Sequence, residues 1–79
     1  MRNTFHGHLT KVQSQLTRQG LTAVLVSSSE NRRYLSGFTG SAGFLYITGE
    51  VSILFTDSRY TQQATNEAPS FEVRPIEKT

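Results

Sequence analysis

Residues 37–60 read GFTGSAGFLYITGEVSILFTDSRY, a glycine-rich loop that leads into two apolar runs. The runs, at 44–48 and 51–56, are short and rich in β-branched and aromatic residues, as β-strands are. Only Gly49-Glu50 separates them, and glycine at the first loop position favours a two-residue type II′ turn. The stretch therefore predicts a β-hairpin preceded by a loop of unusual backbone freedom.

The turn also sets the register of the hairpin. The expected cross-strand pairs are Thr48 with Val51, Ile47 with Ser52, Tyr46 with Ile53, Leu45 with Leu54 and Phe44 with Phe55. Both faces of such a hairpin are largely apolar. We therefore expect helices on both faces of the sheet to which it belongs.

Upstream of the loop, the chain predicts a helix, a strand and a short helical segment. One stripe of an amphipathic helix is formed by Phe5, Leu9, Val12 and Leu16. Gly20 stands where such a helix commonly ends. The apolar run 21–26 is typical of a strand buried on both faces. Ser29 can cap a short helical turn over 29–35.

Downstream of the hairpin, residues 58–67 have a helical composition, and Pro69 stops the helix. Residues 71–74 alternate apolar and polar side chains, as a strand does, and Pro75 places this strand at a sheet edge. The complete order is helix, strand, short helix, strand, strand, helix, strand. That order predicts an α/β fold with a mixed β-sheet.

Size and composition narrow the function classes. The chain has 79 residues, a hydrophobic fraction of 35% and no cysteine, and a small domain without disulfides or metal sites often belongs to a larger protein. The net charge of +2 is scattered, and Arg32-Arg33 is the only adjacent basic pair, so we expect no nucleic-acid partner. No apolar run is long enough to cross a bilayer, so we expect no membrane partner and a cytoplasmic protein.

Few residues could carry chemistry. His6 and His8 are the only histidines, and two positions apart on a helix they point in different directions. The carboxylates are distributed singly, at Glu30, Glu50, Asp57, Glu67, Glu72 and Glu77. Asp57 precedes Arg59 by two residues, which favours a helix cap or a structural ion pair. We therefore expect no catalytic residue and no metal site in this chain.

The loop from Gly37 to Gly43 leaves more than one interpretation. Glycines at 37, 40 and 43 allow positive φ angles and close backbone approach. A phosphate cradle is disfavoured, because no Gly-Lys-Ser/Thr closes the loop and a strand follows it. The loop is then either a tight connection into the hairpin or the lining of a ligand site shared with another domain or subunit. Phe38, between glycines, is placed to project from such a loop.

Two motifs resemble a known family. Residues 31–43, NRRYLSGFTGSAG, and residues 54–64, LFTDSRYTQQA, are similar to the N-terminal domain of Xaa-Pro aminopeptidases and prolidases, the creatinase/prolidase group. The leading helix and the strand at 23–26 occupy the places this resemblance requires. Ser58 stands where the family usually has glycine, so the turn there must tolerate a Cβ. The resemblance implies a creatinase/prolidase N-terminal domain over residues 1–79, truncated at its C-terminal end.

The resemblance also implies a division of labour. The family's C-terminal domain, of pita-bread fold, supplies two Asp, one His and two Glu to a pair of divalent metal ions, usually manganese, cobalt or zinc. Asp57 is the only aspartate here, so that domain and its metals are expected outside this chain. By resemblance the parent enzyme, an aminopeptidase or a dipeptidase, hydrolyses Xaa-Pro bonds in proline-containing peptides, and this chain alone does not.

The N-terminal domain in this family makes oligomer contacts and walls a neighbouring subunit's substrate site. By resemblance, the wall or subunit contact falls on Phe38, Thr39, Gly40 and Ser41, and the structural corner on Asp57, Arg59 and Tyr60. Its partners would be the catalytic domain of the same polypeptide and further copies of the chain. Two alternatives stay open: a stand-alone module that binds a small ligand or a protein, and the N-terminal domain of a creatinase-like amidinohydrolase or an inactive relative.

Overall fold

The computed structural model describes residues 4–76, with side chains from residue 6 onward. The elements in chain order are α1 (Thr4–Gln19), β1 (Val24–Val26), α2 (Ser29–Ser36), β2 (Phe44–Ile47), β3 (Ser52–Asp57), the 3-10 turn η1 (Ser58–Tyr60), α3 (Thr61–Glu67) and β4 (Glu72–Ile76). The order matches the sequence prediction, with residues 58–67 divided into a 3-10 turn and an α-helix. Ser28, not Ser29, caps α2, because its Oγ accepts the Asn31 N–H at 3.1 Å. No helix within residues 4–76 is both long and apolar enough to span a bilayer.

The four strands form one mixed sheet in the order β1-β2-β3-β4. β1, β2 and β3 pair in antiparallel fashion, and β4 lies parallel to β3 at the sheet edge. The mixed α/β fold is thereby confirmed. Pro75 lies in the edge strand β4, where a missing N–H costs no ladder bond to a further strand.

The β2–β3 hairpin has the expected register but a different turn. Phe44 pairs with Phe55 and Ile47 with Ser52. Gly49 does not have a positive φ, so the predicted type II′ turn is wrong. The hydroxyl of Thr48 explains the difference, because its Oγ1 accepts the backbone N–H groups of Glu50 at 3.1 Å and Val51 at 2.9 Å.

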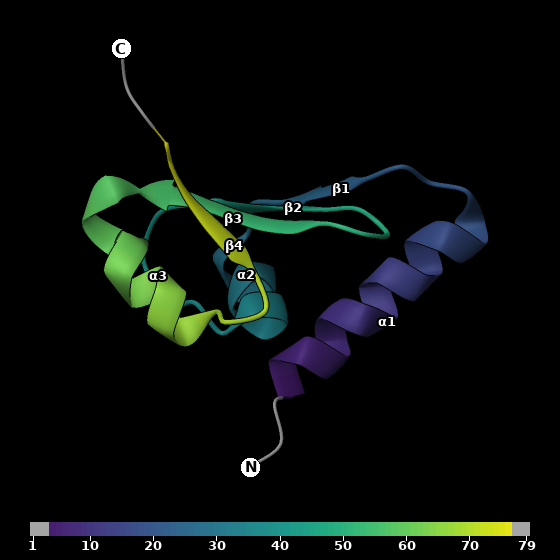
Figure 1. The fold of residues 1–79 in the computed structure, drawn as a ribbon, viewed down its shortest axis with the longest axis horizontal. Helices are drawn as coiled ribbons and strands as arrows, with labels where there is room; N and C mark the ends of the chain where they lie inside the picture. The colour runs from purple at the N-terminus through teal and green to yellow at the C-terminus, as the bar shows by residue number, and fades with distance from the viewer. Residues whose placement is uncertain (1–3, 77–79) are drawn as a thin grey trace.

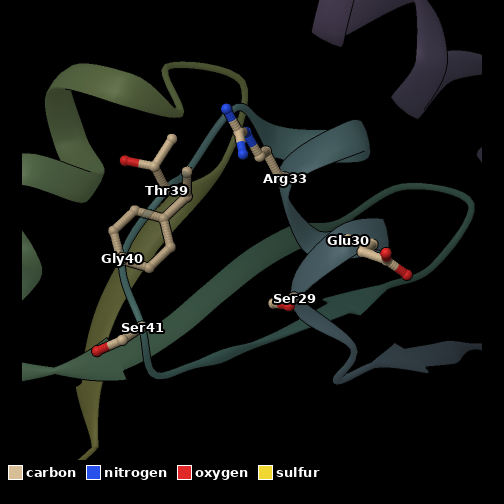
Figure 2. Close-up of a pocket in the computed structure, with 7 residues that line it drawn as sticks. Ser29, Glu30, Arg33, Thr39, Gly40 and Ser41 are labelled. Carbon is tan, nitrogen blue, oxygen red and sulfur yellow. The ribbon is translucent and has the colours of Figure 1, made fainter.

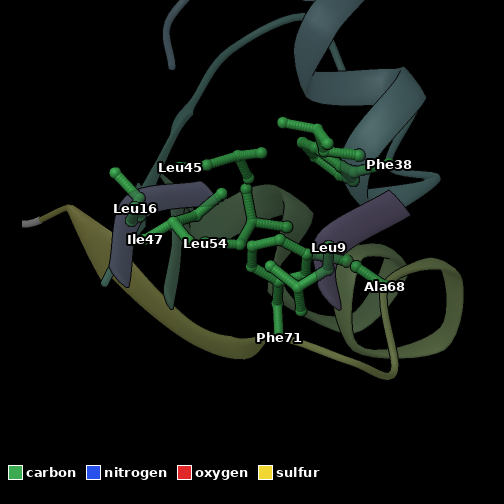
Figure 3. Packing of buried hydrophobic residues seen from close by; sticks show 10 residues of the cluster. Leu9, Leu16, Phe38, Leu45, Ile47, Leu54, Ala68 and Phe71 are labelled. Carbon is green, nitrogen blue, oxygen red and sulfur yellow. The ribbon is translucent and has the colours of Figure 1, made fainter. Parts of the chain in front are cut away.

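The core lies between one face of the sheet and the three helices. In Figure 1 the sheet is seen nearly edge-on, with α1, α2 and α3 all on the same side of it. Figure 3 shows the buried side chains that meet there, and the labelled ones are Leu9, Leu16, Phe38, Leu45, Ile47, Leu54, Ala68 and Phe71. The α1 stripe contributes Leu9 and Leu16 to this core, with Val12 packed against it. The side chain of Phe5, the first residue of that stripe, lies outside the described side chains.

The other face of the sheet carries no helix from residues 4–76, so one of the two expected helix layers is present in this part of the chain. Leu25 is 62% exposed and Tyr46 is 37% exposed on that face. The prediction that β1 is buried on both faces is therefore wrong, because β1 is a three-residue edge strand covered from one side. Phe44 and Phe55 stack on the same open face, with ring centroids 5.0 Å apart.

Candidate functional site

The loop between α2 and β2, residues 37–43, is held by hydrogen bonds along its length. It begins where Gly37, at φ +87°, ends α2 and donates its N–H to Arg33 O at 2.8 Å. Glycine suits this left-handed position because a Cβ would be strained there. Ser36 Oγ then donates to Arg32 O at 2.6 Å and accepts the Phe38 N–H at 3.1 Å. The first half of the loop is thus fixed to the end of α2.

Phe38 points into the core. Its side chain is 1% exposed, and its ring meets that of Tyr60 edge-on with centroids 6.2 Å apart. The expectation that Phe38 projects from the loop is wrong, because its transfer from water into the core is favourable. Gly40 makes room for the ring: a Cβ at Gly40 would lie 2.8 Å from Cε1 and Cε2 of Phe38 and closer still to Cζ. The glycine is required here by the packing of the ring.

Arg32 anchors the second half of the loop from α2. Its side chain is 3% exposed, and its guanidinium donates to three backbone carbonyls. The bonds run from Nη1 to Ser27 O at 3.1 Å and to Gly43 O at 2.9 Å, and from Nη2 to Gly40 O at 3.0 Å. Because Gly40 and Gly43 are held by one rigid group, the backbone between them has a fixed span.

Thr39 is tied to α3. Glu67 accepts its N–H at 2.9 Å and its hydroxyl at 3.1 Å, and Gln63 Nε2 donates to the same carboxylate at 3.3 Å. The hydrogen bond from the Thr39 backbone, followed by those from Gln63 and the Thr39 hydroxyl, holds the pKa of Glu67 below its usual 4.5, against a smaller opposing effect of burial. The positive charge of Arg33 acts in the same direction.

The end of the loop is tied to β3 and η1. Ser41 Oγ lies 2.9 Å from the Tyr60 hydroxyl, and Thr56 Oγ1 donates to Ala42 O at 2.6 Å. Gly43 has φ +143°, and a Cβ there would lie 2.6 Å from the backbone oxygen of Phe55. Only glycine fits where the loop passes so close to β3.

The corner after β3 brings together the other residues singled out in the sequence. Asp57 Oδ1 accepts the Arg59 N–H at 2.9 Å and the Arg59 Nε–H at 3.2 Å. The Arg59 guanidinium lies 5.3 Å from the centroid of the Tyr60 ring. No residue other than glycine has a positive φ within residues 4–76, so Ser58 occupies the corner without backbone strain. Since Arg59 is 72% exposed, its ion pair contributes little to stability.

A shallow concavity of about 270 Å³ lies between the loop and α2. Figure 2 shows Thr39, Gly40 and Ser41 along the loop, with Ser29, Glu30 and Arg33 on the neighbouring helix. Phe38 also forms part of the lining. Thr39 and Ser41 are exposed. Because the Thr39 hydroxyl already bonds to Glu67 and Gln63, hydrogen bonds to a molecule placed there can come from the Ser41 hydroxyl and the Arg33 guanidinium.

The histidines and carboxylates do not assemble a metal site in the described part of the chain. Among residues 4–76, no three His, Asp or Glu side chains come close enough to hold an ion. His8 instead stacks on Tyr34, with ring centroids 4.0 Å apart, and its Nδ1 lies 2.9 Å from Tyr34 O. His6 Nδ1 lies 3.3 Å from Ser70 Oγ. Both histidines attach the start of α1 to the rest of the fold.

Two residues that matter for the loop were not singled out by the sequence. Charge alone does not distinguish Arg32 from the scattered basic residues, but its spacing from Leu35 and Ser36 places it on the buried face of α2. That spacing could have identified it. Glu67 lies 28 positions from Thr39, and no local pattern links residues so far apart.

The sequence of the chain matches the sequence model of a known protein family. The model of the creatinase/prolidase N-terminal domain matches residues 8–79. The chain belongs to this family. This creatinase/prolidase N-terminal domain is 40% identical over 65 residues to the uncharacterized peptidase YqhT of Bacillus subtilis. The match covers 82% of the chain and 18% of YqhT.

Solved structures agree with this family. The N-terminal domain of the cytoplasmic peptidase PepQ from Mycobacterium tuberculosis is 42% identical, with a TM-score of 0.79 over 91% of this chain and 56% of that one. An Xaa-Pro aminopeptidase from Streptococcus pyogenes is 34% identical, with a TM-score of 0.89 over 98% of this chain and 60% of that one. The chain therefore spans less than two thirds of the length of each relative.

Proposed function

We propose that residues 1–79 belong to the non-catalytic N-terminal domain of a longer polypeptide that hydrolyses Xaa-Pro peptide bonds, as an aminopeptidase or a dipeptidase. The observation that carries this proposal is the family match over residues 8–79. The names of similar proteins support it, because they include an Xaa-Pro aminopeptidase and the peptidase PepQ. By analogy with PepQ, we propose a cytoplasmic location.

The hydrolytic chemistry belongs to the catalytic domain of that polypeptide. Two divalent metal ions, of manganese, cobalt or zinc, would there activate the water that attacks the peptide carbonyl. Residues 4–76 bring no three possible metal ligands together, so the groups described in this chain do not fit a metal pair. Their contribution is binding and orientation.

Thr39 and Ser41 would provide that contribution. Both are exposed on a loop that is otherwise fixed to α2, α3 and β3. A fixed loop loses little conformational entropy when a partner binds. We propose that this loop, with buried Phe38 and Gly40 as its support, closes one side of the peptide site of a neighbouring subunit in a homo-oligomer and limits peptide length there.

The proposal that this chain alone is not catalytic can be tested with the isolated chain. Residues 1–79 with added Mn²⁺ should give no hydrolysis of an Xaa-Pro dipeptide or tripeptide, and turnover above that of a metal-only control would contradict the proposal. The stand-alone alternative predicts a different result, since the loop would then bind its ligand without any catalytic domain.

The loop can be tested in the whole polypeptide. Replacing both Thr39 and Ser41 by alanine should change the ratio of kcat/KM for an Xaa-Pro tripeptide to that for a dipeptide by about fivefold or more. Thr65→Ala is a matched control, because Thr65 is an exposed residue of α3 whose hydroxyl bonds only to Thr61 O at 2.8 Å. An unchanged ratio in the double variant would remove the loop from the substrate site.

A further inference from the structure

Arg32 is the one charged side chain in the described residues that is buried without a carboxylate partner. It is 3% exposed, and its Nε has no hydrogen-bond partner. The two ion pairs among residues 4–76 belong to other arginines, Arg59 and Arg74. Burying a cation in this way costs free energy that carbonyl hydrogen bonds offset only in part. A purely structural role would be filled at lower cost by an apolar side chain of similar volume.

The geometry of Arg32 indicates what the buried cation does. Its two terminal nitrogens hold Gly40 O and Gly43 O, the two ends of the segment that carries Ser41. A bond to Ser27 O attaches the same group to the chain just before α2. A lysine ammonium carries its three N–H donors on one nitrogen, so it cannot reproduce the planar fork that fixes the separation of the two carbonyls.

We infer that Arg32 is a positioning residue for the peptide site: it fixes the loop at residues 40–43 so that Ser41 and Thr39 are ordered before substrate or a neighbouring subunit arrives. This inference rests on the proposed function. Arg32 touches no substrate, because it is buried beneath the loop. Its effect is to reduce the ordering cost of binding, and such an effect changes KM more than kcat.

Hydrogen exchange in the whole polypeptide tests the structural half of the inference. The N–H groups of Gly37, Phe38 and Thr39 all have acceptors in the native loop. Exchange over residues 37–43 should become about tenfold faster in Arg32→Met, because local opening then costs less. Arg18→Met removes the same charge from an exposed position of α1 and should leave exchange in the loop unchanged. If Arg32→Met does not fold, Arg32→Lys can replace it. This variant keeps a positive charge but loses the planar pair of donors to Gly40 O and Gly43 O, so loop exchange should again be faster than in the unmodified polypeptide.

Steady-state kinetics test the functional half. Arg32→Met should raise KM for an Xaa-Pro peptide by about tenfold while kcat changes by less than about twofold. Loop exchange that stays slow, or faster exchange with an unchanged KM, would overturn the inference. If the unmodified polypeptide does not hydrolyse Xaa-Pro bonds, the proposed function fails, and the exchange measurement still decides whether Arg32 orders the loop.

Discussion

Gly40→Ala gives a sharp test of how the loop is packed. The added Cβ would lie 2.8 Å from two carbons of the Phe38 ring and closer to a third, and Phe38 is 1% exposed. The ring cannot move away without disturbing its contact with Tyr60. Overpacking of this kind costs about 2–3 kcal/mol. For a domain of this size, the melting temperature should fall by roughly 10–20 °C.

Thermal unfolding of the 79-residue chain, followed by circular dichroism, measures this effect. Gly7→Ala is the matched control, because Gly7 lies in α1 and nothing comes within 4 Å of an added Cβ. Alanine in a helix should stabilise the chain by about 0.5–1 kcal/mol relative to glycine. If the free energy of unfolding of Gly40→Ala lies within about 0.5 kcal/mol of that of the unmodified chain, Phe38 is not packed tightly against Gly40.

Three further changes test other parts of the account. Thr39 holds the pKa of Glu67 below 4.5, so their contact stabilises the fold at neutral pH and this stabilisation is lost as the pH falls below about 4.5. In Glu67→Gln the melting temperature should therefore depend less on pH in that range. An unchanged slope of melting temperature against pH would exclude the contact. Leu54→Ala should lower the free energy of unfolding, measured in urea, by about 2–5 kcal/mol, because Leu54 is buried in the core. Leu25→Ala, on the open face of the sheet, should lower it by under about 1 kcal/mol. Equal losses would contradict the assignment of one face to the core and the other to solvent. Asp57→Ala should cost about 1 kcal/mol by removing the η1 cap, and unchanged thermal stability would show that it does not hold the corner.

Local patterns predicted much of the fold. The length of the two-residue connection at Gly49-Glu50 set the β2–β3 register, which the structure confirms from the Phe44–Phe55 pair to the Ile47–Ser52 pair. Pro75 predicted an edge strand because proline cannot donate to a ladder. The spacing of Leu9 and Leu16 placed α1 on the core. These features depend on neighbours in sequence, so their physical cause is visible in the sequence itself.

Other features depend on contacts between distant residues. Thr48 changed the turn type through a side-chain hydrogen bond that competes with the backbone pattern. Composition could not decide whether Phe38 faces solvent or core, because the answer depends on Gly40 and Tyr60. The partnership of Thr39 with Glu67 joins two elements 28 positions apart. Such tertiary contacts define the loop, and for this reason the candidate site was located by the sequence but its packing was not.

The central proposal is that this chain belongs to an Xaa-Pro peptidase. The most direct test is the rate at which the whole polypeptide carrying residues 1–79, with Mn²⁺, cleaves two peptides that differ only by proline or alanine at the second position. We expect kcat/KM for the proline peptide to exceed that for the alanine peptide by about tenfold or more. Equal rates for the two peptides, or hydrolysis of creatine in place of either, would contradict it.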